Sequence, residues 1–336
     1  MMDFHSLEWR DDHLEVIDQT VLPDRLEIRK LTSAADVVDA IQRMVVRGAP
    51  AIGVCGAFGV VLGLDGGLPL DRLVEAIGSA RPTGVNLRAA VERVARAAAT
   101  SDDADEGRAG ALAEALAMWR EDRDACERIG AFGREELASV RRVLTHCNTG
   151  RLATTGIGTA LGIVYAKAQA HEEIEVLATE TRPALQGARL TAWELTEAGI
   201  PVTLIADTAA GSALRSGRVD AVVVGCDRVA RNGDVANKIG TYTLAVVAHA
   251  VGIPFYVAGP MTSFDPAAPD GGSIPVEERS GDEVTSVAGI RTAPDVAVWN
   301  PAFDVTPAQL VTAFITDRGV LRPPYEESIG TTLVTP

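Results

Sequence analysis

Residues 219–260 read VDAVVVGCDRVARNGDVANKIGTYTLAVVAHAVGIPFYVAGP. The opening run VDAVVVG is apolar and rich in β-branched residues, which is typical of a buried parallel strand. RNGDVANK has the composition of a loop with a turn, and a helix follows it. GIPFYVAGP then predicts the next strand, so the stretch indicates one β–loop–α–β unit of a parallel sheet.

Three polar residues of this stretch are candidates for chemistry. Asp227 comes two residues after the predicted strand end at Gly225, and ligands of open α/β sheets bind at the carboxyl ends of strands. Asn237 and Lys238 precede the helix, and an amide with a cation beside a helix N-terminus is typical of an anion site. The ordinary alternatives are a turn cap for Asp227 and a solvated surface charge for Lys238.

The composition is that of a globular protein with room for two domains. Of the 336 residues, 47% are apolar and 23% are charged, and the formal net charge is −15. This acidic balance argues against nucleic-acid binding, which relies on a basic surface. Neither a signal peptide nor a transmembrane run is evident, and Cys55, Cys126, Cys147 and Cys226 are too far apart for a metal or disulfide motif. We therefore expect a cytoplasmic protein that has reduced thiols and does not bind membranes.

Hydrophobic patterning divides the chain near residue 138. Residues 4–30 alternate polar and apolar and predict two or three antiparallel strands, after which helical spacing dominates. From Arg142 strands alternate with helices, which predicts a Rossmann-like, doubly wound parallel sheet. We therefore expect a mainly helical N-terminal domain with a small antiparallel β element, residues 1–138, and an α/β catalytic domain, residues 139–336.

Individual elements follow from the same patterns. Ser33 is expected to cap a helix over 33–46, residues 100–108 to form an acidic loop, and one or two helices to cover 109–140. Expected strands of the second domain are 143–147, 173–180, 200–207 and 219–225, and expected helices are 155–170, 183–199 and 208–217. A polar loop over 261–283, a candidate lid, precedes a last strand and helix within 295–319.

Four neighbouring strands are followed by polar side chains. Cys147 follows the first, Arg182 and Gln186 the second, Asp207 the third and Asp227 the fourth. A thiol at a strand end near a helix N-terminus is placed where a thiolate is stabilised. Turn caps explain one or two of these residues, whereas polar groups at all four predict a functional site at the carboxyl edge of the sheet.

The N-terminal domain offers two cations at helix junctions. Arg47 opens the break Arg47-Gly48-Ala49-Pro50 between two helical stretches, and Arg81 precedes the turn before another helix. Both are candidate anion contacts. A glycine pattern, GIGTALG at 156–162, is similar to a dinucleotide fingerprint but has the spacing GxGxxxG, so close helix packing is the favoured interpretation.

Six motifs resemble those of the methylthioribose-1-phosphate isomerases. They are VVRGAPAIG, RPTGVNL, THCNTG, ETRPALQGARLTAWEL, ADTAAG and GCDRVARNGDVANKIGTY, and the resemblance extends from about residue 6 to residue 319. NKIGT and the strand before it also resemble the regulatory subunits of translation initiation factor 2B and ribose-1,5-bisphosphate isomerase. RGAPAIG, HCNTG and the long ETRPALQGARLTAWEL run favour the methylthioribose-1-phosphate isomerases.

The resemblance implies conversion of 5-methylthioribose 1-phosphate to 5-methylthioribulose 1-phosphate in methionine salvage. It also implies a homodimer that uses neither a metal ion nor an organic cofactor. By position, Cys147 and Asp227 would be catalytic. The residues that would hold the sugar phosphate are Arg47, Gly48, Ala49, Arg81, Gln186, Asn237 and Lys238.

One position departs from the family pattern. The resemblance implies aromatic residues, which isomerases of this family usually have after the VNL motif, where this chain has Arg88-Ala89-Ala90. If those aromatics contact the 5-substituent, a related substrate such as 5-deoxyribose 1-phosphate becomes reasonable, whereas simple variation of a helix surface is the alternative. A non-enzymatic subunit that senses a nucleotide or sugar phosphate is a further hypothesis, and the presence of both Cys147 and Asp227 argues for an enzyme.

Overall fold

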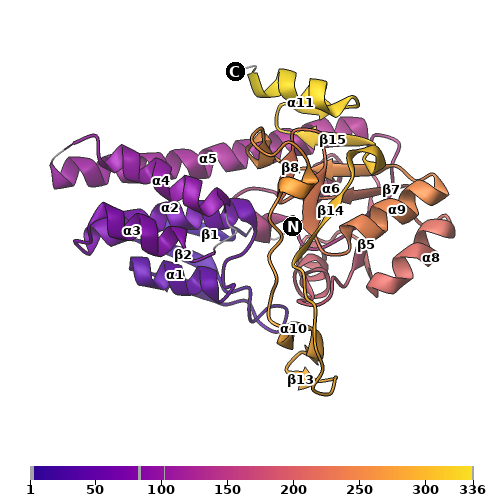
Figure 1. Cartoon of the computed structure of the whole chain (residues 1–336), viewed down its shortest axis with the longest axis horizontal. Coiled ribbons are helices and arrows are strands. Elements are labelled where there is room, and N and C mark those ends of the chain that lie inside the picture. Colours follow the sequence, from indigo (N-terminus) through magenta and orange to yellow (C-terminus); the bar gives the residue numbers. More distant parts are fainter. Residues whose placement is uncertain (1–3, 82–84, 102, 335–336) are drawn as a thin grey trace. The chain divides into compact units, whose positions relative to one another are not determined.

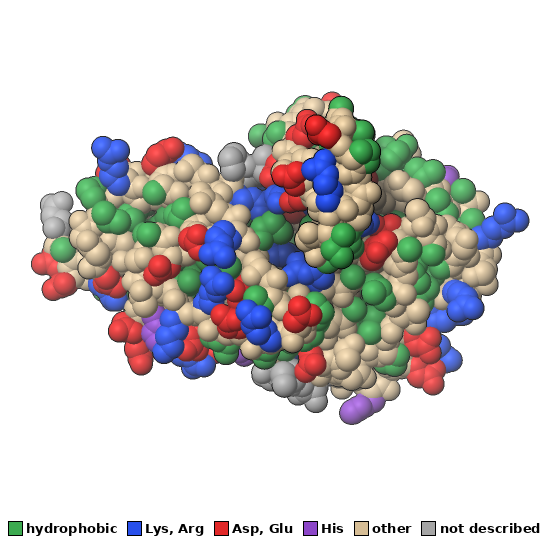
Figure 2. Space-filling view, turned by 90° about the horizontal axis from the view of Figure 1, so that it is seen from below, with side chains coloured by type: hydrophobic (Ala, Val, Ile, Leu, Met, Phe, Trp, Pro, Cys, Tyr) green, Lys and Arg blue, Asp and Glu red, His purple; other side chains and the backbone are tan. Residues whose placement is uncertain are grey.

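The computed structural model describes residues 4–81, 85–101 and 103–334, in which an α/β part follows a mainly helical part (Figure 1). The predicted fold class is thereby confirmed. Within these residues, no helix combines the length and the apolar character needed to cross a membrane. Acidic and basic side chains are interspersed on the face shown in Figure 2, so charges of both signs meet the solvent there.

The chain forms two compact units. The α/β unit comprises Arg128–Asn148 and Thr159–Pro336, and the helical unit comprises Met2–Glu127 and Thr149–Gly158. The chain therefore passes from one unit to the other after Glu127 and returns briefly for the segment that follows Asn148. The domain boundary near residue 138 remains a prediction.

A small antiparallel sheet opens the helical unit, as predicted for residues 4–30. Its strands are β1 (Leu7–Arg10), β2 (His13–Ile17) and β3 (Ile28–Leu31), in that order. Leu7 and Leu14 are fully buried in the same core as the helices. The sheet therefore contributes one apolar face to that core.

The helix α2 (Ala49–Asp65) lies at the centre of this unit. Every residue from Ala51 to Gly63 is buried, and the helix packs along α4 (Val85–Ala98). Ser33 caps α1 with a reciprocal capping box, as predicted. The remaining helices are α1 (Ala34–Gln42), α3 (Leu70–Gly78) and α5 (Ala104–Glu136).

The acidic loop predicted over residues 100–108 is wrong in its second half, because α5 already begins at Ala104. The carboxylate of Asp103 accepts hydrogen bonds from the backbone N–H groups of Asp105 and Glu106, both at 3.0 Å. Acidic side chains at a helix start satisfy exposed N–H groups and complement the helix dipole. The same acidic residues that suggest a loop therefore start a helix, which runs without a break to Glu136.

A seven-stranded sheet forms the core of the α/β unit, in the order β16-β15-β10-β7-β4-β5-β6. All of its strand pairs are parallel except that of β15 with β16. The doubly wound sheet predicted from the alternating pattern is thereby confirmed. The strands are β4 (Arg142–Thr145), β5 (Glu175–Thr179), β6 (Val202–Ile205), β7 (Ala221–Val224), β10 (Phe255–Ala258), β15 (Ala313–Thr316) and β16 (Gly319–Leu321).

The strand order reverses at β4. The chain proceeds from β4 outward through β5 to β6 and then returns to the other side of β4 with β7, where Val143 lies opposite Ala221. In open α/β sheets, such a reversal leaves a crevice at the carboxyl ends of the two strands, where ligands bind. The topology therefore singles out the residues that follow β4 and β7.

The helices of this unit are shorter than the sequence pattern suggests. The helix predicted over 155–170 begins only at Ala160, and the one predicted over 183–199 is a π-helical turn, Gly187–Thr191, continued by a short α-helix. Figure 1 shows α8 and α9 side by side. Apart from the short α10 (Asp282–Thr285), the α-helices between Thr159 and Val334 are α6 (Ala160–Gln169), α7 (Ala192–Glu197), α8 (Ala210–Arg215), α9 (Thr241–Val251) and α11 (Tyr325–Val334).

The loop predicted at residues 231–238 is wrong, because it contains a strand. β8 (Arg228–Ala230) and β9 (Val235–Lys238) form an antiparallel hairpin, with Gly233 at φ +89° in the turn. The hairpin joins β11 (Phe264–Asp265) and β14 (Phe303–Thr306) in a second sheet of order β11-β8-β9-β14. The turn residues Asn232 to Asp234 are those that hairpins require, but the pairing partners are distant in sequence.

Within 295–319 the predicted strand is present, but the predicted helix is wrong because a second strand takes its place. The segment holds β14 and β15, joined by one 3-10 turn at Ala308–Leu310. β-branched residues flank this turn on both sides and favour extended backbone, which confines the helical geometry to one turn. The polar loop predicted over 261–283 contains two 3-10 turns, Met261–Ser263 and Gly271–Ser273, and β11, and it ends in the first turn of a short helix, α10 (Asp282–Thr285). A two-stranded ribbon of β12 (Ser286–Val287) and β13 (Ile290–Arg291) follows it.

Candidate active site

Cys147 and Asp227 follow the two strands that flank the reversal of the sheet. Cys147 comes directly after β4 and His146, and Asp227 follows β7 after Gly225 and Cys226. Because β4 and β7 are hydrogen-bonded parallel neighbours, both residues lie at the same edge of the sheet. Each is partly buried, which lets a side chain meet a ligand while remaining shielded from bulk water.

The backbone of Cys147 is fixed by two threonine hydroxyls. Its φ is +65°, a left-handed conformation that costs a non-glycine residue about 1 kcal/mol. The N–H of Cys147 donates to Oγ1 of Thr181 at 2.8 Å, and Oγ1 of Thr191 donates to the carbonyl of Cys147 at 2.6 Å. Both threonines are fully buried. The thiol is therefore presented from a rigid backbone whose unfavourable conformation is maintained by its neighbours.

His146, next to the thiol, holds the strand end in place. Its Nε2 lies 2.8 Å from the carbonyl of Ile239 and must donate, so Nδ1 accepts from the Thr179 hydroxyl at 2.7 Å. Burial lowers the pKa of His146, which keeps the ring neutral. A Cβ at Gly240, where φ is +106°, would lie 3.0 Å from the ring. His146 thus connects β4 to the turn before α9.

Gln186 presents a buried acceptor beside the next strand. Its side chain is 6% exposed, and its Oε1 has no hydrogen-bond partner among the described residues. Gly187 follows it because a Cβ there would overlap the carbonyl oxygen of Thr179. A buried carbonyl oxygen without a partner is costly, so such an atom is expected to serve a ligand.

Arg182, which follows β5, and Asp207, which follows β6, form hydrogen bonds with other residues of the α/β unit. The Asp207 carboxylate accepts from the backbone N–H groups of Thr181 at 2.7 Å and Arg182 at 2.6 Å. The Arg182 guanidinium donates to the carbonyls of Pro183 and Val284. Asp207 therefore fixes the chain after β5, which carries the threonine that supports Cys147.

Asn237 and Lys238 end β9, just before α9. Asn237 is buried, and its Nδ2 donates to Oγ1 of Thr241 at 3.0 Å. The Lys238 Nζ donates to the carbonyl of Ala302 at 2.8 Å and lies 4.8 Å from the centre of the Phe303 ring. Both side chains are thus held at the end of the hairpin, as the sequence places them.

The start of α9 is already occupied by an anion of the chain itself. The Asp304 carboxylate accepts from the N–H of Gly240 at 2.7 Å and from the N–H of Tyr242 at 3.1 Å. Burial raises the pKa of Asp304 against these bonds. The anion expected at this helix N-terminus is therefore an internal carboxylate, which no local sequence pattern predicts.

Cys55, Cys126 and Cys226 have thiols that ionise less readily than a free cysteine. Burial raises the pKa of the Cys55 and Cys226 thiols to about 12, and the nearby charge of Asp227 adds to the effect on Cys226. Burial raises the pKa of the Cys126 thiol as well. These three thiols stay protonated at neutral pH, as expected of thiols shielded from solvent.

The remaining predicted residues belong to the helical unit. Arg47 is buried, and it precedes Gly48, whose φ of +96° starts α2 at Ala49. A Cβ at Gly48 would overlap the backbone of Ala153, so only glycine fits there. Arg81 is partly buried after α3. Residues 82–84 of the RPTGVNL motif lie outside the described residues.

The two hydroxyls that hold Cys147, those of Thr181 and Thr191, cannot be recognised from the local sequence. Thr181 lies within ETRPALQG, next to predicted site residues, but nothing local reveals that it accepts a bond from a residue 34 positions earlier. Thr191 lies on a helical pattern and reads as an ordinary core position. Only the pairing of β4 with β5 brings the first of them to Cys147.

Comparison with known proteins gives consistent results over nearly the whole chain. Residues 45–323 match the model of the initiation factor 2 subunit family. A methylthioribose-1-phosphate isomerase of Desulforudis audaxviator (strain MP104C) is 53% identical over 338 residues, which cover 98% of this chain and 97% of the relative. A 5-deoxyribose 1-phosphate isomerase of Moorella thermoacetica is 48% identical and covers 97% of each chain.

The fold agrees with a solved structure. The crystal structure of 5-methylthioribose 1-phosphate isomerase from Pyrococcus horikoshii OT3 superposes with a TM-score of 0.92 at 40% identity, covering 98% of this chain and 95% of that one. Sequence identity of 40–53% over nearly the full length of the chain agrees with the similarity of the fold. The chain therefore belongs to the initiation factor 2 subunit family and, within it, to the methylthioribose-1-phosphate isomerases.

Proposed function

We propose that the chain is an aldose–ketose isomerase that converts 5-methylthioribose 1-phosphate to 5-methylthioribulose 1-phosphate, a step of methionine salvage. The observation that carries the proposal is the position of Cys147 and Asp227 at the ends of adjacent parallel strands, β4 and β7. Relatives about half identical over the full length carry the same name. We also propose that the protein works in the cytoplasm as a homodimer.

Asp227 is the proposed acid for ring opening. In an aldose 1-phosphate the anomeric oxygen is esterified, so no free aldehyde is available. The C1–O4 bond must break, and O4 must gain a proton to become a hydroxyl. A carboxyl can donate that proton only if it is protonated in the complex, which requires a desolvated site that raises its pKa. Bound substrate supplies such desolvation by excluding water.

Cys147 is the proposed residue for hydrogen transfer between carbons. The net change moves hydrogen from C2 to C1, while the C2 hydroxyl loses its proton and becomes the ketone. In one route a Cys147 thiolate removes the C2 proton, and an enol phosphate is then protonated at C1. In the other route hydride moves directly from C2 to C1, and Cys147 stabilises the transition state. Both routes leave the phosphate ester intact.

The phosphate and the sugar are the proposed ligands of the binding residues. Gln186 supports this role through its buried Oε1, and Lys238 through its position at the end of β9. The overall charge of −15 makes a local cluster of donors necessary for holding a phosphate dianion. The proposed set is Arg47, Gly48, Ala49, Arg81, Gln186, Asn237 and Lys238.

Isotope tracing with a Cys147 variant tests the mechanism. Substrate deuterated at C2 is converted in ordinary water by the wild-type protein and by Cys147→Ser. If the deuterium is retained at C1 of the ketose, hydride transfer is supported; its exchange with solvent supports proton removal. Absence of ketose formation by the wild type from any ribose 1-phosphate analogue would falsify the isomerase.

The 5-substituent is the part of the substrate that has a second candidate. The Moorella thermoacetica relative is named for 5-deoxyribose 1-phosphate, and Arg88-Ala89-Ala90 stand where the resemblance leads us to expect aromatic residues. In the helical unit Arg88 is exposed and pairs with Glu75 and Glu92, as an ordinary surface residue does. The test compares kcat/KM for the methylthio, deoxy and 5-phospho substrates. One small apolar group is worth about 10- to 200-fold, so a tenfold preference for methylthio supports the first candidate.

A binding subunit without activity is the other class of function. The family model that matches residues 45–323 is that of the initiation factor 2 subunit family. A sensor needs an anion clamp but has no use for a thiol held in a left-handed backbone. Retained binding of ribose 1-phosphate by a wild-type chain that turns over none of the three substrates would favour this alternative.

A further inference from the structure

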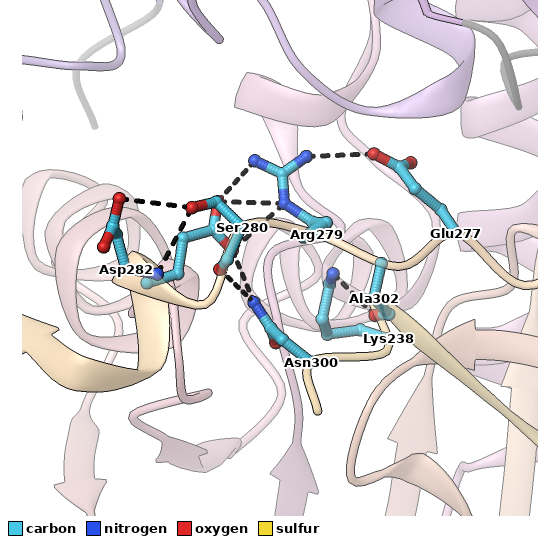
Figure 3. A network of polar contacts seen from close by, with 8 residues as sticks. Lys238, Glu277, Arg279, Ser280, Asp282, Asn300 and Ala302 are labelled. Atoms are coloured by element: carbon cyan, nitrogen blue, oxygen red, sulfur yellow. Dashed lines mark hydrogen bonds and ion pairs between the residues drawn. The ribbon is translucent and has the colours of Figure 1, made fainter. Parts of the chain in front are cut away.

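A network of polar contacts centred on Arg279 lies at the base of an arm, residues 277–302, next to the bond between Lys238 and Ala302 (Figure 3). The two ends of the arm pair with each other: the N–H of Ala302 donates to the carbonyl of Glu277, and the N–H of Arg279 donates to the carbonyl of Asn300. The Ala302 carbonyl in turn accepts from Nζ of Lys238 at 2.8 Å. The base of the arm is therefore attached directly to a proposed phosphate-binding residue.

Arg279 holds two carboxylates in this network. Its Nε lies 2.9 and 3.0 Å from the two carboxylate oxygens of Glu283, and its Nη1 lies 3.2 Å from Oε1 of Glu277. The three side chains are only 19–24% exposed. Burial opposes ionisation of Glu283, yet its hydrogen bonds to Arg279 keep its pKa below the usual range. Glu283 is therefore negatively charged at neutral pH.

This negative charge lies within electrostatic range of Lys238, whose ammonium contributes to the lowered pKa of Glu283. Asn300 also donates to Glu283, at 3.3 Å, and to the carbonyl of Ser280 at 2.9 Å. Without Arg279, the carboxylates of Glu283 and Glu277 would lose their guanidinium partner, and the Glu283 charge acts on Lys238. Their field would then attract the ammonium and repel an incoming dianion.

We propose that Arg279 is a positioning residue: it keeps two neighbouring carboxylates paired to itself, so that the ammonium of Lys238 can meet the phosphate of the substrate. The inference rests on the proposed function, because it takes Lys238 as a phosphate contact. Arg279 itself need not touch the substrate. Its effect is electrostatic and should act on binding of the dianion more than on the chemical step.

The test is a charge-release experiment with a matched control. KM, kcat and the inhibition constant of inorganic phosphate are measured for Arg279→Gln, Glu283→Gln, the double variant and Arg291→Gln. Arg291 lies on the same arm, is exposed and donates to the Ala293 carbonyl, so its removal changes net charge without releasing a carboxylate. We expect R279Q to raise KM and the inhibition constant about tenfold, with kcat changed by less than about threefold.

The expected pattern for the other variants is asymmetric. E283Q should bind at least as tightly as the wild type, R279Q/E283Q should recover most of the lost affinity, and R291Q should change it by less than about twofold. If the pair were only a structural clip, E283Q would weaken binding as much as R279Q and the double variant would not recover. That symmetric result, or equal effects of R279Q and R291Q, overturns the inference.

Lys238→Gln separates this inference from the function on which it rests. If K238Q leaves KM and phosphate inhibition unchanged, Lys238 does not bind phosphate, and both the proposed binding role and the inference fail. If K238Q weakens binding but R279Q does not, only the inference fails. Thermal unfolding of each variant is recorded alongside, so that loss of folded protein is not mistaken for loss of affinity.

Discussion

The backbone N–H of Cys147 donates to Oγ1 of Thr181 at 2.8 Å, and this bond ties the chain after β4 to the chain after β5. Both residues have positive φ, at +65° and +62°. Two strained residues that support each other are typical of a position selected for geometry rather than for stability. The bond therefore places the thiol, and its removal should be visible in catalysis.

Thr181→Val removes the acceptor while keeping the shape of the side chain. The N–H of Cys147 then loses its partner, which costs about 1–3 kcal/mol of stability, and the thiol loses its fixed position. We expect kcat to fall at least about tenfold, with a smaller change in KM. Steady-state kinetics and urea unfolding measure the two effects. Thr181→Ser keeps the hydroxyl and is the control; equal activity of the valine and serine variants would contradict the role.

Cys147→Gly and Cys147→Ala should both abolish turnover. Their order of stability should differ from the usual one, in which a glycine variant is less stable than an alanine variant. Glycine normally destabilises a folded position by about 0.5–1 kcal/mol relative to alanine. At φ +65° alanine bears a conformational cost of about 1 kcal/mol that glycine escapes. The glycine variant should therefore be no less stable than the alanine variant in urea unfolding. A glycine variant clearly less stable than the alanine variant would argue against the left-handed backbone.

Gln186→Leu distinguishes a ligand contact from a structural residue. Oε1 of Gln186 is buried without a partner among the described residues, so leucine removes a group that costs folding free energy. We expect the free energy of unfolding to stay the same or rise, while KM for the sugar phosphate rises about tenfold because a substrate hydrogen bond is lost. A large loss of stability with unchanged KM would identify Gln186 as structural.

Asp220→Asn tests the opposite ends of β4 and β7. The Asp220 carboxylate accepts from the N–H groups of Arg141 and Arg142 at 3.1 and 2.8 Å. Hydrogen bonds from Arg142 are the main cause of the lowered pKa of Asp220. The folded chain therefore binds this proton less readily than the unfolded chain, so the stabilisation is complete above the ordinary pKa of 3.8 and is lost as the pH falls through the lower folded value.

We expect D220N to lower the free energy of unfolding by about 1 kcal/mol at pH 7. The difference from the wild type should shrink as the pH is taken below 3.8. Urea titrations across this range measure it. A difference that stays constant down to the lowest pH would show that the charge of Asp220 does not matter.

The sheet could be predicted because its strands are short apolar runs that each end in turn-forming or polar residues. AVVV of β7 is buried throughout and is recognisable without any partner. The hairpin β8–β9 cannot be recognised from the sequence because its alternation is brief and β9 also pairs with β14, whose residues lie more than 60 positions away. Pairing between distant segments leaves little mark on either of them.

The candidate site divides in the same way. Cys147, Asp227 and Gln186 could be placed because strand ends are visible in the sequence, and the order of the strands then fixes their neighbours. The hydroxyls of Thr181 and Thr191, and the cap that Asp304 provides for α9, depend on contacts across the fold. Positive φ at Cys147 likewise has no signature in residue type, because cysteine rarely adopts it.

The carboxylate of Asp304 occupies the N-terminus of α9, where an anionic ligand would otherwise bind. Helix N-termini commonly bind the phosphate groups of nucleotides. In this protein the Asp304 carboxylate satisfies the N–H groups at the start of α9. The proposed contacts with the phosphorylated sugar therefore come from individual side chains rather than from this helix N-terminus. A phosphate group therefore cannot use the N–H groups of Gly240 and Tyr242 while Asp304 accepts from them.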